Sequence, residues 1–227
     1  MALRRSKRRP PADARALACE ILQQVEAGGF ADALLGERLS RAQLDVRDQA
    51  LATQLVYGTL AWQGFLDHII SGFALRPPSA LDVPVRVVLR LALFQICILT
   101  RIPEFAAVNT AVDLIKRHNG GAATSFVNAV LRRAASGWRG VPLPSRDVDP
   151  VGRLSVELSH PRWLVETWIK LWGIDETEAL LRANNEPAPT VLRANRCATQ
   201  VEELVERLHA AGHNVSRTTY SPVGLRL

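Results

Sequence analysis

The sequence predicts a mainly α-helical protein, with an all-helical bundle followed by a small, incomplete α+β unit. Apolar residues recur at helical spacing from about Ala14 to Ser136, which is typical of helices that bury one face. The stretch 137–149 is rich in Gly and Pro and has no apolar period, so it predicts a linker. Beyond the linker, helical patterns are mixed with short alternating stretches, which indicate a small α+β unit.

The helices of the bundle follow from apolar spacing and from their end signals. Asp13 is placed to cap the first helix, Gly28-Gly29 ends it, and Pro84 suits the first position of a later helix. The stretch 85–98 is apolar on nearly all sides, so we expect it to be the buried central helix. The predicted helices are 14–25, 31–39, 46–60, 65–71, 85–98, 106–117 and 123–133.

The last two helices of the bundle each end on a basic doublet, Lys116-Arg117 and Arg132-Arg133. Cations in the last turn of a helix complement the negative end of its dipole. The same cations could also contact an anionic partner, and the pattern alone leaves both interpretations open.

The C-terminal part combines helices with short strands. Thr199 and Glu202 form a capping-box pattern at the start of its last helix. Trp163, Trp168 and Trp172 share helical spacing with apolar neighbours, which favours packing in a core or between domains over base stacking. The predicted helices are 162–172, 176–183 and 200–211, and the predicted strands are 190–195, 213–219 and 223–227.

Composition is consistent with a polyanionic partner, and a GC-rich genome that favours Arg codons explains the excess of Arg equally well. The 227 residues carry a formal net charge of +6, and nearly all of the basic residues are Arg, which binds phosphate through two parallel hydrogen bonds. The N-terminus has no apolar signal segment, and the most apolar run, 91–100, is too short to span a bilayer, so we expect a cytoplasmic protein without membrane contact. The three scattered cysteines predict neither a disulfide framework nor a metal site.

Two stretches of the sequence resemble a known family. The stretch "AVNTAVDLIKR…FVNAVLRR" resembles the closing helices of the NusB-like domain, and "SHPRWLVETWIKLWG" with "ALLRANNEPAPTVLRAN" resembles the segment before the catalytic domain of the Sun/RsmB ribosomal RNA cytosine-C5 methyltransferases. The resemblance implies an RRM-like or ferredoxin-like fold for the α+β unit. It divides the chain into a basic arm (1–12), a NusB-like helical RNA-binding domain (13–136), a linker (137–152) and an incomplete pre-catalytic α+β domain (153–227).

The catalytic residues of that family have no counterpart in these 227 residues. The family binds S-adenosylmethionine through a D-x-C-A-A-P-G-G-K type loop and uses two cysteines, one of them in a Pro-Cys dipeptide, and neither motif occurs here. Cys19 and Cys97 lie in apolar helical patterns, so we expect them to be buried and unreactive. We therefore predict no catalytic residue, no metal and no cofactor in this chain, with S-adenosylmethionine serving the complete protein, and an inactive chain on its own.

The family resemblance implies that the N-terminal arm and first helix face RNA, with ribosomal RNA as the expected partner. The corresponding cations are Arg4, Arg5, Lys7, Arg8, Arg9 and Arg15. The doublets Lys116-Arg117 and Arg132-Arg133 are further RNA-binding candidates. A solvated tail without a partner is the alternative for the arm.

The resemblance makes four residues of the "ANNEP…LRAN" stretch candidates for the substrate side of the complete enzyme. They are Asn184, Asn185, Arg193 and Asn195. Capping of loops by Asn is the equally weighted alternative.

Three functions remain in view. The first is the RNA-binding N-terminal portion of a ribosomal RNA (cytosine-C5) methyltransferase. The second is a NusB-like transcription antitermination factor that joins RNA to a protein partner, which the stretch 159–227 argues against. The third is a helical domain whose positive charge is incidental.

Overall fold

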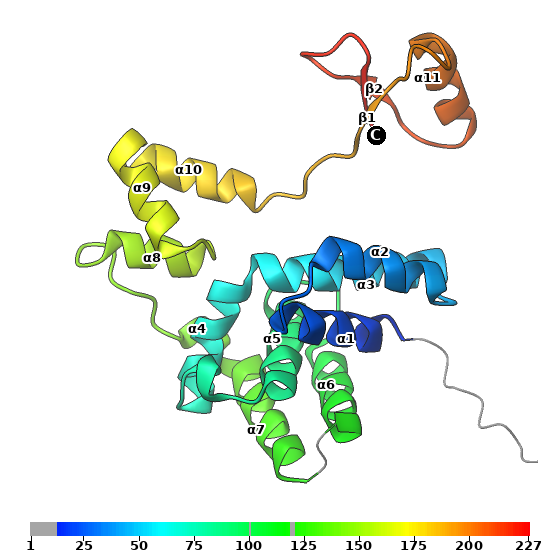
Figure 1. Cartoon of the computed structure of the whole chain (residues 1–227). Helices are drawn as coiled ribbons and strands as arrows, with labels where there is room; N and C mark the ends of the chain where they lie inside the picture. The colour runs from blue at the N-terminus through cyan, green and yellow to red at the C-terminus, as the bar shows by residue number, and fades with distance from the viewer. Residues whose placement is uncertain (1–12, 100, 119–120) are drawn as a thin grey trace, which may run out of the picture. The chain divides into compact units, whose positions relative to one another are not determined.

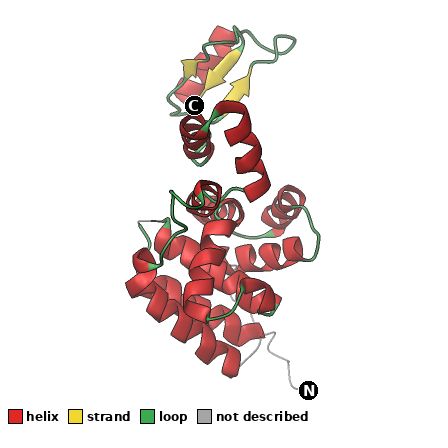
Figure 2. Cartoon of the chain, turned by 90° about the vertical axis from the view of Figure 1, so that its left-hand side faces the viewer, coloured by secondary structure: helices red, strands yellow, loops and turns green. Residues whose placement is uncertain are grey.

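The computed structural model describes residues 13–99, 101–118 and 121–227. The chain divides into two compact units, Met1–Arg182 and Ala183–Leu227 (Figure 1). Helices make up the first unit, and the three strands all lie in the second (Figure 2). This arrangement confirms the predicted mainly α fold class with a small α+β unit.

The first seven helices share one hydrophobic core. Helix α5 lies at its centre and packs against α1, α3, α4, α6 and α7. Nearly every side chain from Val85 to Ile96 is buried, which confirms the predicted central helix. The helices of this bundle are α1 (Ala14–Glu26), α2 (Ala31–Arg41), α3 (Val46–Ala61), α4 (Gln63–Ala74), α5 (Val83–Cys97), α6 (Glu104–His118) and α7 (Ala122–Gly137).

The ends of the helices follow the sequence signals in part. The Asp13 side chain accepts a hydrogen bond from the backbone N–H of Arg15 at 3.0 Å and caps α1, as predicted. Helix α7 continues to Gly137, one turn beyond the Arg132-Arg133 doublet. The doublet therefore does not occupy the last turn, and the interpretation of Arg132 and Arg133 as complements of the helix dipole is wrong.

Three further helices follow the bundle within the first unit and share a small core of their own. They are α8 (Pro150–Glu157), α9 (Arg162–Trp172) and α10 (Ile174–Asn184), whose last two residues lie beyond the unit boundary. Leu154, Leu158, Val165 and Leu181 form this core. Ser159 links it to the bundle, because its Oγ accepts a hydrogen bond from the backbone N–H of Gly64 at 3.0 Å, at the start of α4. The stretch expected to be a linker, 137–152, contains the 3₁₀ turn Trp138–Gly140 and the first turn of α8.

The tryptophans of α9 correct one expectation. The side chain of Trp163 is 68% exposed and that of Trp172 is 52% exposed, so neither packs in a core within its unit. Trp168 is partly buried against the small core and lies 6.0 Å from Trp172, measured between ring centroids. Only Trp168 therefore matches the predicted packing role.

The second unit is a three-stranded antiparallel sheet with one helix. The strands are β1 (Val191–Arg193), β2 (Ser216–Arg217) and β3 (Gly224–Arg226), in the order β1-β3-β2, and the helix is α11 (Val201–Ala210). Leu225 is fully buried and pairs with Leu192 on one side and with Arg217 on the other. Its contacts with Ala194 and Val201 form the core of this unit.

Candidate nucleic-acid interface

The two basic doublets lie far apart. Helices α6 and α7 follow each other through a short turn that includes Gly121 at φ +82° and run antiparallel (Figure 1). Lys116 and Arg117 therefore lie near the turn, whereas Arg132 lies ten residues into α7, which is about 15 Å along the helix axis at 1.5 Å per residue. One phosphate cannot contact both doublets.

The Lys116-Arg117 doublet is exposed. Lys116 Nζ lies 3.7 Å from Asp113 Oδ1, a surface pair worth at most about 1 kcal/mol. Arg117 has no carboxylate partner among the described residues. The proposed RNA contact of this doublet stays a prediction.

Arg15 is held in place by a buried amide. Its Nε donates to Gln95 Oε1 at 2.8 Å, and Gln95 Nε2 donates to the backbone carbonyl of Leu91 at 2.9 Å. Gln95 is only 2% exposed, so α5 fixes the direction of the Arg15 side chain. Among the described residues, the remaining donors of the guanidinium have no partner, so they could bind an anion. The arm residues Arg4, Arg5, Lys7, Arg8 and Arg9 lie outside the described residues.

The second doublet lies on α7 beside α4. Arg132 Nε donates to Asn128 Oδ1 at 3.0 Å, one turn away. The guanidinium carbon of Arg133 lies 5.9 Å from the ring centroid of Phe73, which belongs to α4. Neither arginine has a carboxylate partner in the part of the chain that the structure describes. Two more arginines of this region, Arg76 and Arg139, were missed by sequence reasoning. Arg76 meets Phe126 only after α4 packs against α7, and Arg139 lies over its neighbour Trp138 beyond the end of α7.

The substrate-side candidates belong to the end of α10 and to the sheet unit. Asn184 and Arg193 are exposed, and Asn185 is partly buried. Asn195 Oδ1 accepts a hydrogen bond from the backbone N–H of Cys197 at 3.1 Å, which is the geometry of a loop cap. This hydrogen bond supports the capping role for Asn195. The substrate-side role of the four residues stays a prediction.

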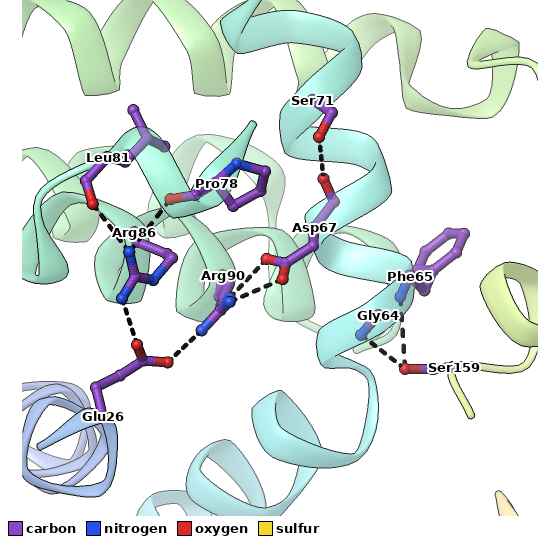
Figure 3. Close-up of polar contacts among 10 residues, drawn as sticks. All are labelled: Glu26, Gly64, Phe65, Asp67, Ser71, Pro78, Leu81, Arg86, Arg90 and Ser159. Atoms are coloured by element: carbon purple, nitrogen blue, oxygen red, sulfur yellow. Dashed lines mark hydrogen bonds and ion pairs between the residues drawn. The ribbon is translucent and has the colours of Figure 1, made fainter. Parts of the chain in front are cut away.

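The densest charge cluster of the bundle is internally neutralised. Arg90 donates to Asp67 through two bonds, Nε to Oδ1 at 2.6 Å and Nη2 to Oδ2 at 2.7 Å (Figure 3). Arg90 Nη1 donates to Glu26 Oε1 at 2.5 Å, and Arg86 pairs with the other oxygen of Glu26. Arg86 also donates to the backbone carbonyl of Leu81 at 2.9 Å. Two cations and two carboxylates satisfy one another, so the cluster holds α1, α4 and α5 together.

Burial and ion pairing act on Glu26 in opposite directions. Burial raises the pKa of its carboxyl group, but the hydrogen bonds from Arg86 and Arg90 outweigh burial, so the pKa lies below its ordinary value of 4.5. A depressed carboxyl pKa adds stability above the unfolded-state value, and that stability is lost as the pH falls through the folded-state value.

We expect Glu26→Gln to lower the free energy of unfolding by about 1 kcal/mol at neutral pH, because a charged acceptor of two arginines is lost. The difference from the wild type should shrink as the pH falls below 4.5. Urea denaturation followed by circular dichroism at pH 7, 5 and 3.5 measures it. Glu20→Gln, at an exposed carboxylate 3.7 Å from Arg38, is the control and should change little at any pH. A difference that stays constant across this range would contradict the assignment.

The cysteines of the bundle are poor nucleophiles. Burial raises the pKa of Cys19 to about 11 and that of Cys97 to about 12, so both thiols are protonated at neutral pH. Among the described residues, no group of three His, Cys, Asp or Glu side chains could hold a metal ion. Within the same residues, no helix combines the length and apolar character needed to cross a membrane.

Known proteins match the chain in two parts. The NusB family matches residues 12–136, and the ferredoxin-like domain of the Methyltr_RsmF/B-like proteins matches residues 160–227. In fold, the chain is similar to PH0851, with a TM-score of 0.69, 21% identity and coverage of 95% of this chain and 48% of that one. It is also similar to T. maritima NusB, with a TM-score of 0.51, 24% identity and coverage of 55% and 89%.

Curated relatives cover both parts at once. The probable ribosomal RNA small subunit methyltransferase B of Bacillus subtilis is 33% identical over 204 residues, which cover 89% of this chain and 45% of that protein. The ribosomal RNA small subunit methyltransferase B of Thermus thermophilus is 38% identical over 182 residues, covering 80% and 41%. The chain thus spans less than half the length of these relatives. It belongs to the NusB family through residues 12–136, and it joins that domain to the ferredoxin-like domain of the RsmF/B-like methyltransferases.

Proposed function

We propose that this chain is the RNA-binding portion of a cytoplasmic, S-adenosylmethionine-dependent ribosomal RNA (cytosine-C5) methyltransferase, and that methyl transfer is carried out by residues outside these 227. The observation that carries the proposal is the pair of domain matches within one chain, shared with relatives named ribosomal RNA small subunit methyltransferase B. The positive charge of the chain and the arginines without carboxylate partners support RNA as the partner.

The pocket beside α4 and α5 does not fit S-adenosylmethionine. Its lining includes Glu26, Asp67, Arg86 and Arg90. Both of its carboxylates are already engaged by arginines, so none is left for the donor's ribose hydroxyls or sulfonium. No step of methyl transfer is therefore assigned to this chain.

The alternative, a NusB-like antitermination factor with a protein partner, accounts for residues 12–136 but leaves the match at 160–227 without a role. We therefore rank it second.

The proposal is tested by titrating the purified chain into labelled small-subunit ribosomal RNA and following fluorescence anisotropy at low salt. We expect binding, and we expect no transfer of labelled methyl groups from S-adenosylmethionine to the RNA. Absence of binding at low salt would reject the RNA role, and methyl incorporation by the chain alone would show that the chemistry lies within it. Preferential recovery of transcription-complex proteins over ribosomal RNA precursors in a pull-down would favour the alternative.

A further inference from the structure

Three guanidinium groups lie over aromatic rings along the line where α4 packs against α7. Arg76 lies 4.7 Å from the ring centroid of Phe126, and Arg139 lies 4.5 Å from that of Trp138. Arg133 lies 5.9 Å from the centroid of Phe73. We call Arg76, Arg133 and Arg139 the α4–α7 arginine row.

Each of the two helices supplies an aromatic ring to an arginine from the other side of the packing. Arg133 of α7 lies over Phe73 of α4, and Arg76, two residues beyond the end of α4, lies over Phe126 of α7. At the other end of the row, the ring of Trp138 meets that of Phe65 of α4, edge to face, at 6.0 Å. The antiparallel packing of α4 and α7 therefore sets the positions of Arg76 and Arg133, whereas Arg139 lies over its neighbour Trp138, whose ring contacts α4 through Phe65.

The length of the row suits an extended ligand. Phe126 and Trp138, which carry its outer members, are twelve residues apart, which corresponds to about 18 Å along a helix axis. A single small anion could contact only one end of such a row, while a nucleic-acid strand carries phosphates along its whole length.

The row has no internal counter-charge. None of its members forms an ion pair within the described residues, whereas Arg86, Arg90 and Arg162 are each held by carboxylates. The sequence explains the contrast, because it contains no Asp or Glu from 68 to 81 or from 114 to 146. Asp67, the acidic residue of α4, is bonded to Arg90.

An aromatic ring beneath a guanidinium restricts its motion and leaves the N–H groups at its edge free to donate. These are the donors that bind phosphate through two parallel bonds. All three arginines are exposed, while Phe73, Phe126 and Trp138 are only partly so. The row is therefore organised before a ligand arrives, which reduces the entropy lost on binding.

We propose that the α4–α7 arginine row binds the phosphate backbone of RNA. This inference rests on the proposed function for the identity of the polyanion, and it adds Arg76 and Arg139 to the RNA-binding residues. The contact is made to phosphates and not to base edges, so it strengthens binding to all RNA sequences about equally.

The test compares the wild-type chain with the triple variant Arg76→Gln, Arg133→Gln, Arg139→Gln, using fluorescence anisotropy with single-stranded ribosomal RNA at fixed salt. Losing three phosphate contacts should weaken binding by about 10- to 100-fold. The matched control is Arg38→Gln, Arg41→Gln, Arg47→Gln on α2 and α3, which removes the same charge elsewhere and should change the Kd by less than about 3-fold. The triple lysine variant at 76, 133 and 139 keeps the charge but loses the planar fork, and should bind with intermediate affinity.

Far-ultraviolet circular dichroism checks that each variant folds. If the triple glutamine variant does not fold, Arg76→Gln alone replaces it, because Arg76 is exposed and lies beyond the end of α4; that variant should lose about 2- to 5-fold in affinity. Wild-type binding combined with an equal loss in the row and control variants would overturn this inference alone. Failure of the wild-type chain to bind RNA would overturn the proposed function together with it.

Discussion

Replacing Arg90 by methionine should lower the free energy of unfolding by about 2–4 kcal/mol, since it leaves the partly buried Asp67 carboxylate without a partner and Glu26 with Arg86 alone. The side chain of Arg90 is 8% exposed, and its three short bonds reach Asp67 on α4 and Glu26 on α1. Burial lowers the pKa of Arg90, but its hydrogen bonds and charge interactions with Asp67 and Glu26 outweigh burial and raise it, so the group stays charged. For a chain of this size the loss corresponds to a fall in Tm of about 5–15 °C.

Thermal and urea denaturation of Arg90→Met measure this effect. The control is the double variant Arg90→Met, Asp67→Asn, in which the carboxylate that loses its partner is neutralised together with the arginine, while Glu26 keeps Arg86. Because most of the cost comes from unpaired charge, the double variant should be more stable than Arg90→Met alone. A double variant that is less stable than the single one would mean that the cluster stabilises the fold through its net pairing energy.

Replacing Gly58 by alanine should destabilise the bundle by about 1–3 kcal/mol, although alanine is the better helix former. A Cβ at this position of α3 would lie 2.0 Å from Cζ of Phe94 in α5. Phe94 is only 3% exposed and cannot move into solvent, so α3 and α5 would have to separate. The absence of a side chain at Gly58 is what allows the two helices to approach here.

The double variant Gly58→Ala, Phe94→Leu separates this clash from a general loss of packing. Leucine shortens the side chain at the point of contact, so the double variant should be more stable than the sum of the two single changes predicts. Urea denaturation of the four proteins gives the coupling free energy. A Gly58→Ala variant as stable as the wild type would show that the contact relaxes at no cost.

The sequence predicted the helices of the bundle well because each of them buries one face. The periodic patterns from 14–25 to 123–133 all correspond to observed helices, and the apolar stretch 85–98 is the central one. Their ends were less certain, since α7 runs four residues past the predicted end at Arg133 and continues to Gly137. Because of this extension, Arg132 and Arg133 do not lie in the last turn of α7, and their interpretation as complements of its dipole is wrong.

Short elements were harder to predict because local signals compete. Helix α8 was missed directly after the stretch 137–149, which is rich in Gly and Pro, although Asp149 caps it and Pro150 stands at its first position. The capping box at Thr199 and Glu202 was wrong, because Gln200 is the N-cap of α11 and Thr199 Oγ1 donates to Glu203 Oε2 at 2.8 Å. A capping motif of two residues does not determine the first residue of a helix to within one position.

The proposed RNA-binding residues depend on tertiary structure to a greater degree. Sequence reasoning selected Arg132 and Arg133 because they stand together in the chain. Arg76 is separated from α7 by more than one helix in sequence and meets Phe126 only after α4 packs against α7. The signal that could have indicated the region is the absence of Asp and Glu from 114 to 146.

The salt dependence of RNA affinity tests the central claim most directly. The binding constant of the wild-type chain for single-stranded ribosomal RNA is measured by anisotropy between about 50 and 200 mM KCl. If arginines and lysines of this chain bind phosphates, the logarithm of the association constant falls linearly with the logarithm of the salt concentration, by about 0.7 per phosphate contact. An affinity that is the same at both ends of the range would contradict the account.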